Sequence, residues 1–172
     1  MDEKLAMIYK RRSIRKFREE ALEKETLLEL VKAGMAAPTA CNNQPWEFVV
    51  VDDPEIMLTF RKRMKDGPYN APAAIVICFS PHMSRQSRCD RYWVQDCSAA
   101  TENMLVAAVG LGLGAVWLGV FPNEEKVSIV REIVHLPDNV TPMAVIYAGY
   151  PAEEKEAHTK YEERRVHWQV YS

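Results

Sequence analysis

The sequence lacks a strong net charge, a leader of the basic and apolar kind, and an unbroken apolar run of membrane-spanning length. Its formal charge of −2 creates no field that would attract nucleic acid or an anionic membrane. The first ten residues, MDEKLAMIYK, are acidic and amphipathic, unlike a secretory leader. Glycines interrupt the longest apolar run, residues 104–121, which indicates a buried helix followed by a strand. We therefore expect a cytoplasmic protein that binds neither nucleic acid nor a membrane.

Cysteine pairs of the metal-binding type are absent too. The four cysteines form no CxxC pair, and Cys89 and Cys97 are spaced too widely for a common zinc motif. This spacing predicts reduced thiols, as in a cytoplasmic protein, and no metal site. Internal repeats and low-complexity tracts are also absent. A chain of this length buries roughly 70% of its unfolded surface, so we expect one domain over residues 1–172.

Hydrophobic periodicity predicts both helices and strands. Apolar residues recur at intervals of three and four in the expected helices, which we place at residues 2–10, 23–36, 54–65, 89–111 and 123–134. Short apolar or alternating runs predict strands at residues 47–51, 73–80, 115–121, 141–150 and 166–171. The two opening helices precede every strand, which favours an α+β fold over a doubly wound sheet.

The tail has a pattern of its own. Residues 151–160 are too polar to pack, and they predict a surface connection. After them, Val166, Trp168 and Val170 alternate with more polar residues, which is the period of a strand. Such a strand could pair with its own sheet or with the edge of a partner. The second arrangement would make an intertwined dimer.

The stretch GLGLGA at residues 110–115 has the G-x-G-x-x-A spacing of a dinucleotide-binding turn. That turn needs a strand before it and a helix after it, because the helix N-terminus must face the pyrophosphate. Here the predicted helix comes first and the strand follows. We therefore expect these glycines to end the helix and turn the chain.

Two polar segments carry the candidate chemistry. Residues 11–17, RRSIRKF, place Arg11 and Arg15 four apart, on one face if the backbone is helical, and guanidinium groups match phosphate oxygens. The same run could simply complement a helix dipole, and the acidic pair that follows it disfavours nucleic acid. Residues 37–48, APTACNNQPWEF, could present amides to a heteroaromatic ring or form a polar turn that satisfies itself.

Several motifs together resemble a known family. RRSIRKF, then APTACNNQPWEFVVV, then the helix that leads into GLGLGAVWLGVF, and finally GYP before a tail containing RRVHW are similar to the FMN-dependent nitroreductase family over nearly the whole chain. The resemblance implies an α+β nitroreductase-like fold, with a central mixed or antiparallel sheet flanked by helices. It also implies an intertwined homodimer with an exchanged C-terminal strand and two FMN sites at the dimer interface.

The resemblance also implies positions for FMN binding, and no catalytic side chain. The segment expected to hold the phosphate and ribityl chain contributes Arg11, Arg12, Ser13 and Arg15. The loop expected to reach the flavin from the other subunit contributes Pro38, Thr39, Ala40, Asn42 and Gln44. The strand segment expected beside the isoalloxazine contributes Trp117, Leu118 and Gly119. The tail positions expected to complete the phosphate site are Lys160 and Arg165.

The implied activity is that of an FMN oxidoreductase that uses NADH or NADPH. It would reduce nitroaromatics, quinones or similar small electrophilic acceptors by a ping-pong mechanism. The same fold also allows enone or azo reduction, a flavin-consuming or dehalogenating reaction, or flavin binding without turnover in a sensor or store. Cys41 departs from the family pattern, because a small hydroxyl residue would be unsurprising there. A thiol so near a redox ring could be oxidisable or could simply fit.

Overall fold

The computed structural model describes residues 2–171. Its helices are α1 (Ala6–Lys10), α2 (Lys24–Met35), α3 (Pro54–Arg63), α4 (Trp93–Gly110) and α5 (Glu124–Ile133). Its strands are β1 (Trp46–Val51), β2 (Ala73–Phe79), β3 (Gly114–Gly119) and β4 (Thr141–Gly149). Short 3-10 helices are η1 (Glu3–Leu5), η2 (Ala40–Asn42), η3 (Pro81–Met83), η4 (Ser87–Tyr92) and η5 (Glu163–Arg165).

The strands form one sheet in the order β1-β2-β4-β3, and every neighbouring pair is antiparallel. The predicted α+β class is confirmed. Of the two sheet types that were predicted, mixed or antiparallel, the sheet is antiparallel. The predicted helix over residues 89–111 begins later, at Trp93, because the chain before it forms η4. The other helices and the four sheet strands lie within a few residues of their predicted bounds.

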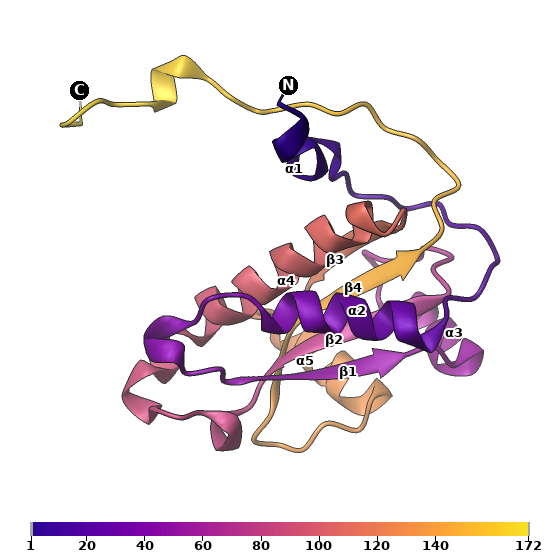
Figure 1. Cartoon of the computed structure of the whole chain (residues 1–172). Helices are drawn as coiled ribbons and strands as arrows, with labels where there is room; N and C mark the ends of the chain where they lie inside the picture. Colours follow the sequence, from indigo (N-terminus) through magenta and orange to yellow (C-terminus); the bar gives the residue numbers. More distant parts are fainter. Residues whose placement is uncertain (1, 172) are drawn as a thin grey trace.

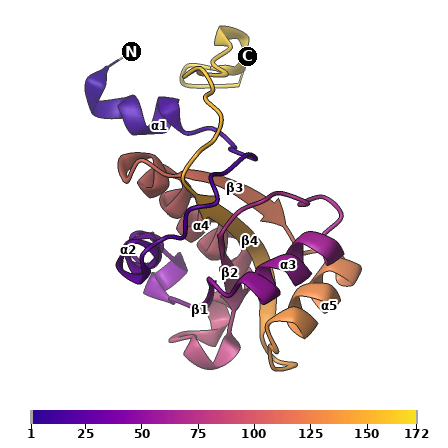
Figure 2. The ribbon, with the colours of Figure 1, turned by 90° about the vertical axis from the view of Figure 1, so that its right-hand side faces the viewer.

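Helices cover both faces of the sheet (Figure 2), and each face has its own apolar cluster. Successive side chains of a strand point to opposite faces. The cluster that contains residues of α2 and α4 receives from β2 the side chains Ala73, Ile75 and Ile77. The cluster that contains residues of α3 and α5 receives from β2 the side chains Ala74, Val76 and Cys78. A strand buried on both faces is apolar throughout, which is why the sequence of β2 shows no polar alternation.

The glycines between α4 and β3 turn the chain, as the sequence predicts. Gly112 has a φ of +71°, a left-handed conformation that glycine adopts without a steric penalty. Gly114 is needed for a close approach, because a Cβ there would lie 2.7 Å from the Ile14 side chain. The dinucleotide-turn geometry is absent, since α4 precedes the glycines and β3 follows them. This packing brings the N-terminal segment against the start of β3.

The tail is not a strand in the single chain, so the prediction for residues 166–171 is wrong at this level. After β4 the tail runs away from the body and past α1 (Figure 1). Its apolar side chains are exposed, with Trp168 at 77% and Val170 at 71%. A strand needs an edge to pair with, and the tail meets none within its own chain. Among residues 2–171, no helix combines the length and hydrophobicity that a bilayer crossing requires.

Candidate cofactor-binding site

The basic segment is extended, and hydrogen bonds tie it to the body at several points. The Ile14 N–H donates to the Ala115 carbonyl at 3.0 Å, beside a parallel bridge between Ser13 and Ala115. Phe17 and Asn70 exchange two hydrogen bonds, of 3.1 and 2.7 Å. Ile14 and Phe17 are buried, and they anchor the segment between its cations. Since α1 ends at Lys10, the idea that the arginines share one helical face is wrong.

The arginines of this segment have different surroundings. The Arg11 Nε lies 3.3 Å from a carboxylate oxygen of Glu102 on α4. The Arg12 Nη1 lies 3.1 Å from the Nε2 of His158, whereas the buried Nε of Arg12 has no hydrogen-bond partner within residues 2–171. The Arg15 guanidinium lies 5.9 Å from the centre of the Tyr69 ring. A buried donor without a partner costs free energy, so Arg12 is ready to bind an added acceptor.

Two charged residues that the sequence did not single out complete this region. Glu153 accepts a hydrogen bond of 2.6 Å from the Arg15 backbone N–H. Lys155 lies 3.1 Å from that carboxylate and donates to the Ser13 carbonyl at 2.6 Å. The Arg15 hydrogen bond, and then Lys155, hold the pKa of Glu153 below its usual range. A cavity of about 220 Å³ opens here, lined in part by Lys10, Arg12, Glu153 and Lys155.

A second hollow lies on the other side of the basic segment. It has a volume of about 210 Å³, and its lining includes Arg15, Tyr69, Trp117, Leu118, Gly119 and Lys126. The fold therefore brings Arg15 together with the predicted segment of β3. Gly119 is exposed, and a Cβ built on it would meet no atom within 4 Å. The backbone at this edge of β3 is open to a planar molecule.

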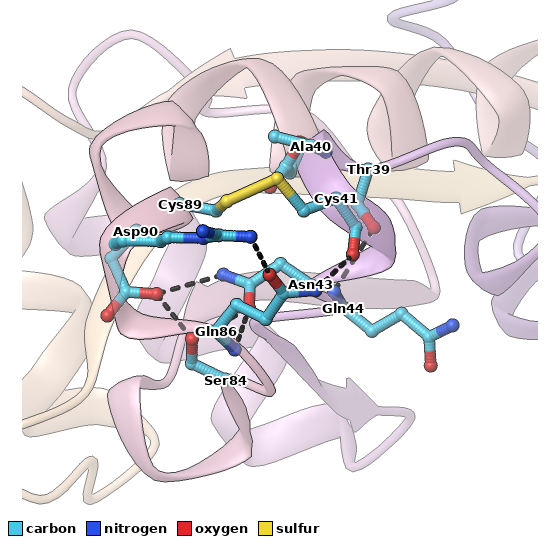
Figure 3. The surroundings of a disulfide bond; sticks show 11 residues. Thr39, Ala40, Cys41, Asn43, Gln44, Ser84, Gln86, Cys89 and Asp90 are labelled. Atoms are coloured by element: carbon cyan, nitrogen blue, oxygen red, sulfur yellow. Dashed lines mark hydrogen bonds between the residues drawn. A yellow bond between two sulfur atoms is a disulfide. The ribbon is translucent and has the colours of Figure 1, made fainter.

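The predicted polar loop, residues 39–44, is held by residues 84–96, which we call the clamp segment (Figure 3). The side chain of Asn43, which is 0% exposed, donates to the Asp90 carboxylate at 2.9 Å. It accepts from the Gln86 N–H at 2.7 Å and from the Ser84 hydroxyl at 2.9 Å. The family resemblance implied flavin contacts for Asn42 and Gln44, and the role of Asn43 as the buried anchor of the loop was not predicted. Its burial could not be read from a run of polar letters.

Asp96 anchors the same loop from α4. One carboxylate oxygen of Asp96 accepts from the Ala40 N–H at 2.8 Å, and the other has no partner among residues 2–171. The residue is only 3% exposed. Burial raises the pKa of Asp96, and the Ala40 hydrogen bond opposes that change in part. Asp96 thus fixes the loop backbone, although the sequence predicted no role for it beyond its place in a helix.

The sequence-based prediction for the cysteines is wrong for two of the four. Cys41 and Cys89 form a disulfide, with their Cα atoms 6.6 Å apart, which joins the polar loop to η4 (Figure 3). Cys78 and Cys97 are free and buried, and burial raises the pKa of Cys78 to about 12. The paired residues are 48 positions apart, so only tertiary structure brings them together. Because disulfides are rare in the cytoplasm, the cysteines no longer support that localisation.

A single chain does not gather all the predicted residues. The basic segment leads into one end of α2, and the polar loop with Pro38, Thr39, Ala40, Asn42 and Gln44 follows the other end (Figure 1). A helix of this length spans about 18 Å. In the tail, Lys160 is exposed and Arg165 pairs with Glu162 at 2.7 Å, in a part of the chain that leaves the body. Arg15 and residues 117–119 share one hollow, whereas the loop lies elsewhere.

Comparisons with known proteins agree with this architecture. A model of the nitroreductase family matches residues 8–68 and 59–150. A protein of Archaeoglobus fulgidus, provisionally named NADH dehydrogenase/NAD(P)H nitroreductase, is 44% identical over 172 residues, which covers 97% of this chain and 98% of that protein.

Two solved structures match as well. A protein of Parabacteroides distasonis with the same provisional name is 35% identical, with a TM-score of 0.89, over 99% of this chain and 100% of its own. A provisionally assigned nitroreductase of Desulfovibrio desulfuricans in complex with FMN is 28% identical, with a TM-score of 0.79, over 100% of this chain and 99% of its own.

Proposed function

The chain belongs to the nitroreductase family, and on that premise we propose that it is an FMN-dependent oxidoreductase that uses NADH or NADPH. Its acceptors in this proposal are nitroaromatics, quinones or similar small electrophiles. The observation that carries the proposal is the hollow shared by Arg15 and residues 117–119. The unpartnered Arg12 Nε, in the cavity with Lys155, adds a second cation that can accept an anion. Cations beside an open strand edge suit a ligand with an anionic tail and a planar head.

The residues present fit FMN. In our assignment the phosphate and ribityl chain are held by Arg11, Arg12, Ser13 and Arg15, with Lys160 and Arg165 from the tail. The ring system lies beside Trp117, Leu118 and Gly119, where a missing Cβ leaves the backbone open. Three acids near these cations oppose a phosphate, and each is already engaged. Glu153 accepts from the Arg15 N–H and pairs with Lys155, Glu102 pairs with Arg11, and Asp66 pairs with Lys126. The cations of this region, Arg11, Arg12, Arg15, Lys126 and Lys155, outnumber these three acids, which favours an anion.

We also propose that one site needs two chains. Residues 38–44 lie at the far end of α2 from the basic segment, so a second subunit would have to supply this loop to the flavin. The exposed Trp168 and Val170 are consistent with a tail that pairs with a partner. The proposed assembly is a homodimer in which the C-terminal segments are exchanged.

When bound, FMN would supply the hydride and electron transfer between NAD(P)H and the second substrate, in a ping-pong order. The chain itself supplies position and charge. The Arg15 cation lines the hollow beside residues 117–119, where it would hold the anionic tail of the bound cofactor. Asp96 and Asn43 fix the backbone of the loop that would cover the partner's ring. Trp117, half-buried, walls the hollow against water.

The test is FMN affinity in Arg15→Ala, with Arg18→Ala as a control that removes another exposed arginine. Loss of a charge-assisted hydrogen bond costs about 1.5–3 kcal/mol, so FMN binding should weaken by at least about tenfold in Arg15→Ala. Arg18→Ala should keep the affinity of the wild type. Flavin fluorescence titration of the apoprotein measures both. A colourless wild type whose melting temperature does not respond to FMN would refute the proposed function.

A further inference from the structure

The polar loop and the clamp segment are joined by one covalent bond and several weaker ones. The disulfide links Cys41 to Cys89, and beside it the Gln86 side-chain amide donates to the Cys41 carbonyl at 3.0 Å (Figure 3). Further along the loop, Asn43 and Ala40 are held by hydrogen bonds to Asp90, Gln86, Ser84 and Asp96. The disulfide therefore holds the outer part of the loop, Cys41 and Asn42. The hydrogen bonds hold its base, Ala40 and Asn43.

We propose that Cys41–Cys89 is a reversible redox site, opened by dithiol reductants, that sets how firmly the outer part of the 39–44 loop is held. Its consequence for the cofactor, tighter FMN retention when the disulfide is closed, rests on the proposed function.

The two cysteines differ in their exposure to solvent, which determines which sulfur a reductant attacks first. Cys41 is exposed, whereas Cys89 is only 4% exposed. A thiolate of the dithiol attacks the Cys41 sulfur, the bond to Cys89 breaks, and Cys89 leaves as a thiolate. The second thiol of the reductant then displaces Cys41 and closes its own disulfide. Two electrons pass from the dithiol to the cystine, and the two protons of the dithiol end on Cys41 and Cys89.

The sequence around Cys89 suits a leaving thiolate. Arg85, Arg88 and Arg91 lie in the clamp segment around it, and cations stabilise a thiolate. The acid next to it, Asp90, opposes this effect, but its carboxylate accepts hydrogen bonds from Asn43 and Ser84. With three arginines against Asp90 and Asp96, the clamp segment is cationic on balance.

The disulfide is the one covalent tie on the outer loop, whose backbone has an uncommon shape. Cys41 and Asn42 have φ angles of 55° and 52°, a left-handed conformation that residues other than glycine rarely adopt. Their surroundings must hold them there. With the disulfide open, the outer loop keeps the bond from Gln86, the Asn42 N–H bond to the Thr39 carbonyl at 3.0 Å, and one between the Gln44 and Asn42 side chains. Asn42 is one of the residues we assign to the flavin, so its release should weaken FMN binding without unfolding the base of the loop.

Three measurements on the full-length holoprotein test the inference. Intact mass after alkylation of the denatured protein counts free thiols, and we expect two before reduction, Cys78 and Cys97. After native treatment with excess dithiothreitol, native alkylation should add a label at Cys41, while the buried Cys78 and Cys97 stay protected as internal controls. Hydrogen exchange should then rise at residues 41–42 and stay low at Asn43. Air or oxidised dithiothreitol should reverse each change.

The functional readout is the FMN dissociation rate after the reductant has been removed anaerobically. It should rise roughly tenfold on reduction, which corresponds to about 1.4 kcal/mol. The double variant Cys41→Ser/Cys89→Ser should show the fast rate with or without dithiol, and Cys78→Ala should behave as the wild type. If the double variant does not fold, the comparison of the two redox states of the wild type stands alone.

The outcomes separate the two proposals. A disulfide that stays closed in the native protein, or one that opens without any change in hydrogen exchange at residues 41–42, overturns the redox site. Equal FMN dissociation rates in both redox states overturn its effect on the cofactor. A protein that binds no FMN in either state overturns the proposed function, and the alkylation and exchange measurements still decide whether the redox site exists.

Discussion

Asp96 gives the sharpest test of how the polar loop is held. It is 3% exposed, one of its oxygens accepts from the Ala40 N–H at 2.8 Å, and the other has no partner among residues 2–171. In Asp96→Asn the side-chain oxygen can keep the Ala40 hydrogen bond, while the buried charge disappears. Asp96→Ala removes both the charge and the acceptor, so it leaves the Ala40 N–H without its partner.

The two variants should therefore move stability in opposite directions. An unsatisfied buried charge costs more than an unsatisfied neutral group, and the difference is about 1 kcal/mol. We expect Asp96→Asn to raise the melting temperature by about 2–4 °C at neutral pH. We expect Asp96→Ala to lower it by a similar or larger amount, because a buried backbone donor loses its acceptor.

The pH dependence has a definite sign. Burial raises the pKa of Asp96 in the folded protein above its ordinary value of 3.8, so the folded state binds the proton more tightly than the unfolded state does. The wild type then loses stability as pH rises from about 3.8 through the raised pKa. Asp96→Asn does not titrate, so its advantage should be small in acid and should grow across that interval.

Melting temperatures of the wild type, Asp96→Asn and Asp96→Ala at a series of pH values measure this effect. An advantage of Asp96→Asn that does not change with pH would refute the assignment of a buried, raised-pKa carboxyl. So would equal losses of stability in both variants.

Two further predictions concern the disulfide and the tail. Cys41→Ser/Cys89→Ser should lower the free energy of unfolding by about 4 kcal/mol, because the disulfide closes a loop between residues 48 apart. The melting temperature should fall by about 8–16 °C. A denaturant titration that shows no loss of stability would mean that the disulfide does not form. Deletion of residues 161–172 should convert the proposed dimer to monomer, because burying Trp168 alone would contribute up to about 5 kcal/mol. A truncated protein that sediments as a dimer and retains FMN would rule out the exchanged tail.

The sequence was a good guide to the elements and to the family. Runs such as residues 73–79 are apolar throughout because both faces of β2 are covered, and glycines mark the end of α4 because they turn the chain there. These features depend on neighbours in sequence, so periodicity and turn chemistry suffice to predict them. The family motifs also located the basic segment and the edge of β3, which the fold brings together.

Contacts between distant residues were decided only by the tertiary structure. The Cys41–Cys89 bond, the burial of Asn43 against Gln86 and Asp90, and the Asp96 anchor all join segments more than forty residues apart. The tail shows the reverse case, since its alternating pattern predicts a strand, but within residues 2–171 the tail pairs with neither edge strand of the sheet, β1 or β3. Local sequence specifies the shape and polarity of each segment. Which partner satisfies a given hydrogen bond, thiol or apolar face depends on packing, and packing is a property of the whole fold.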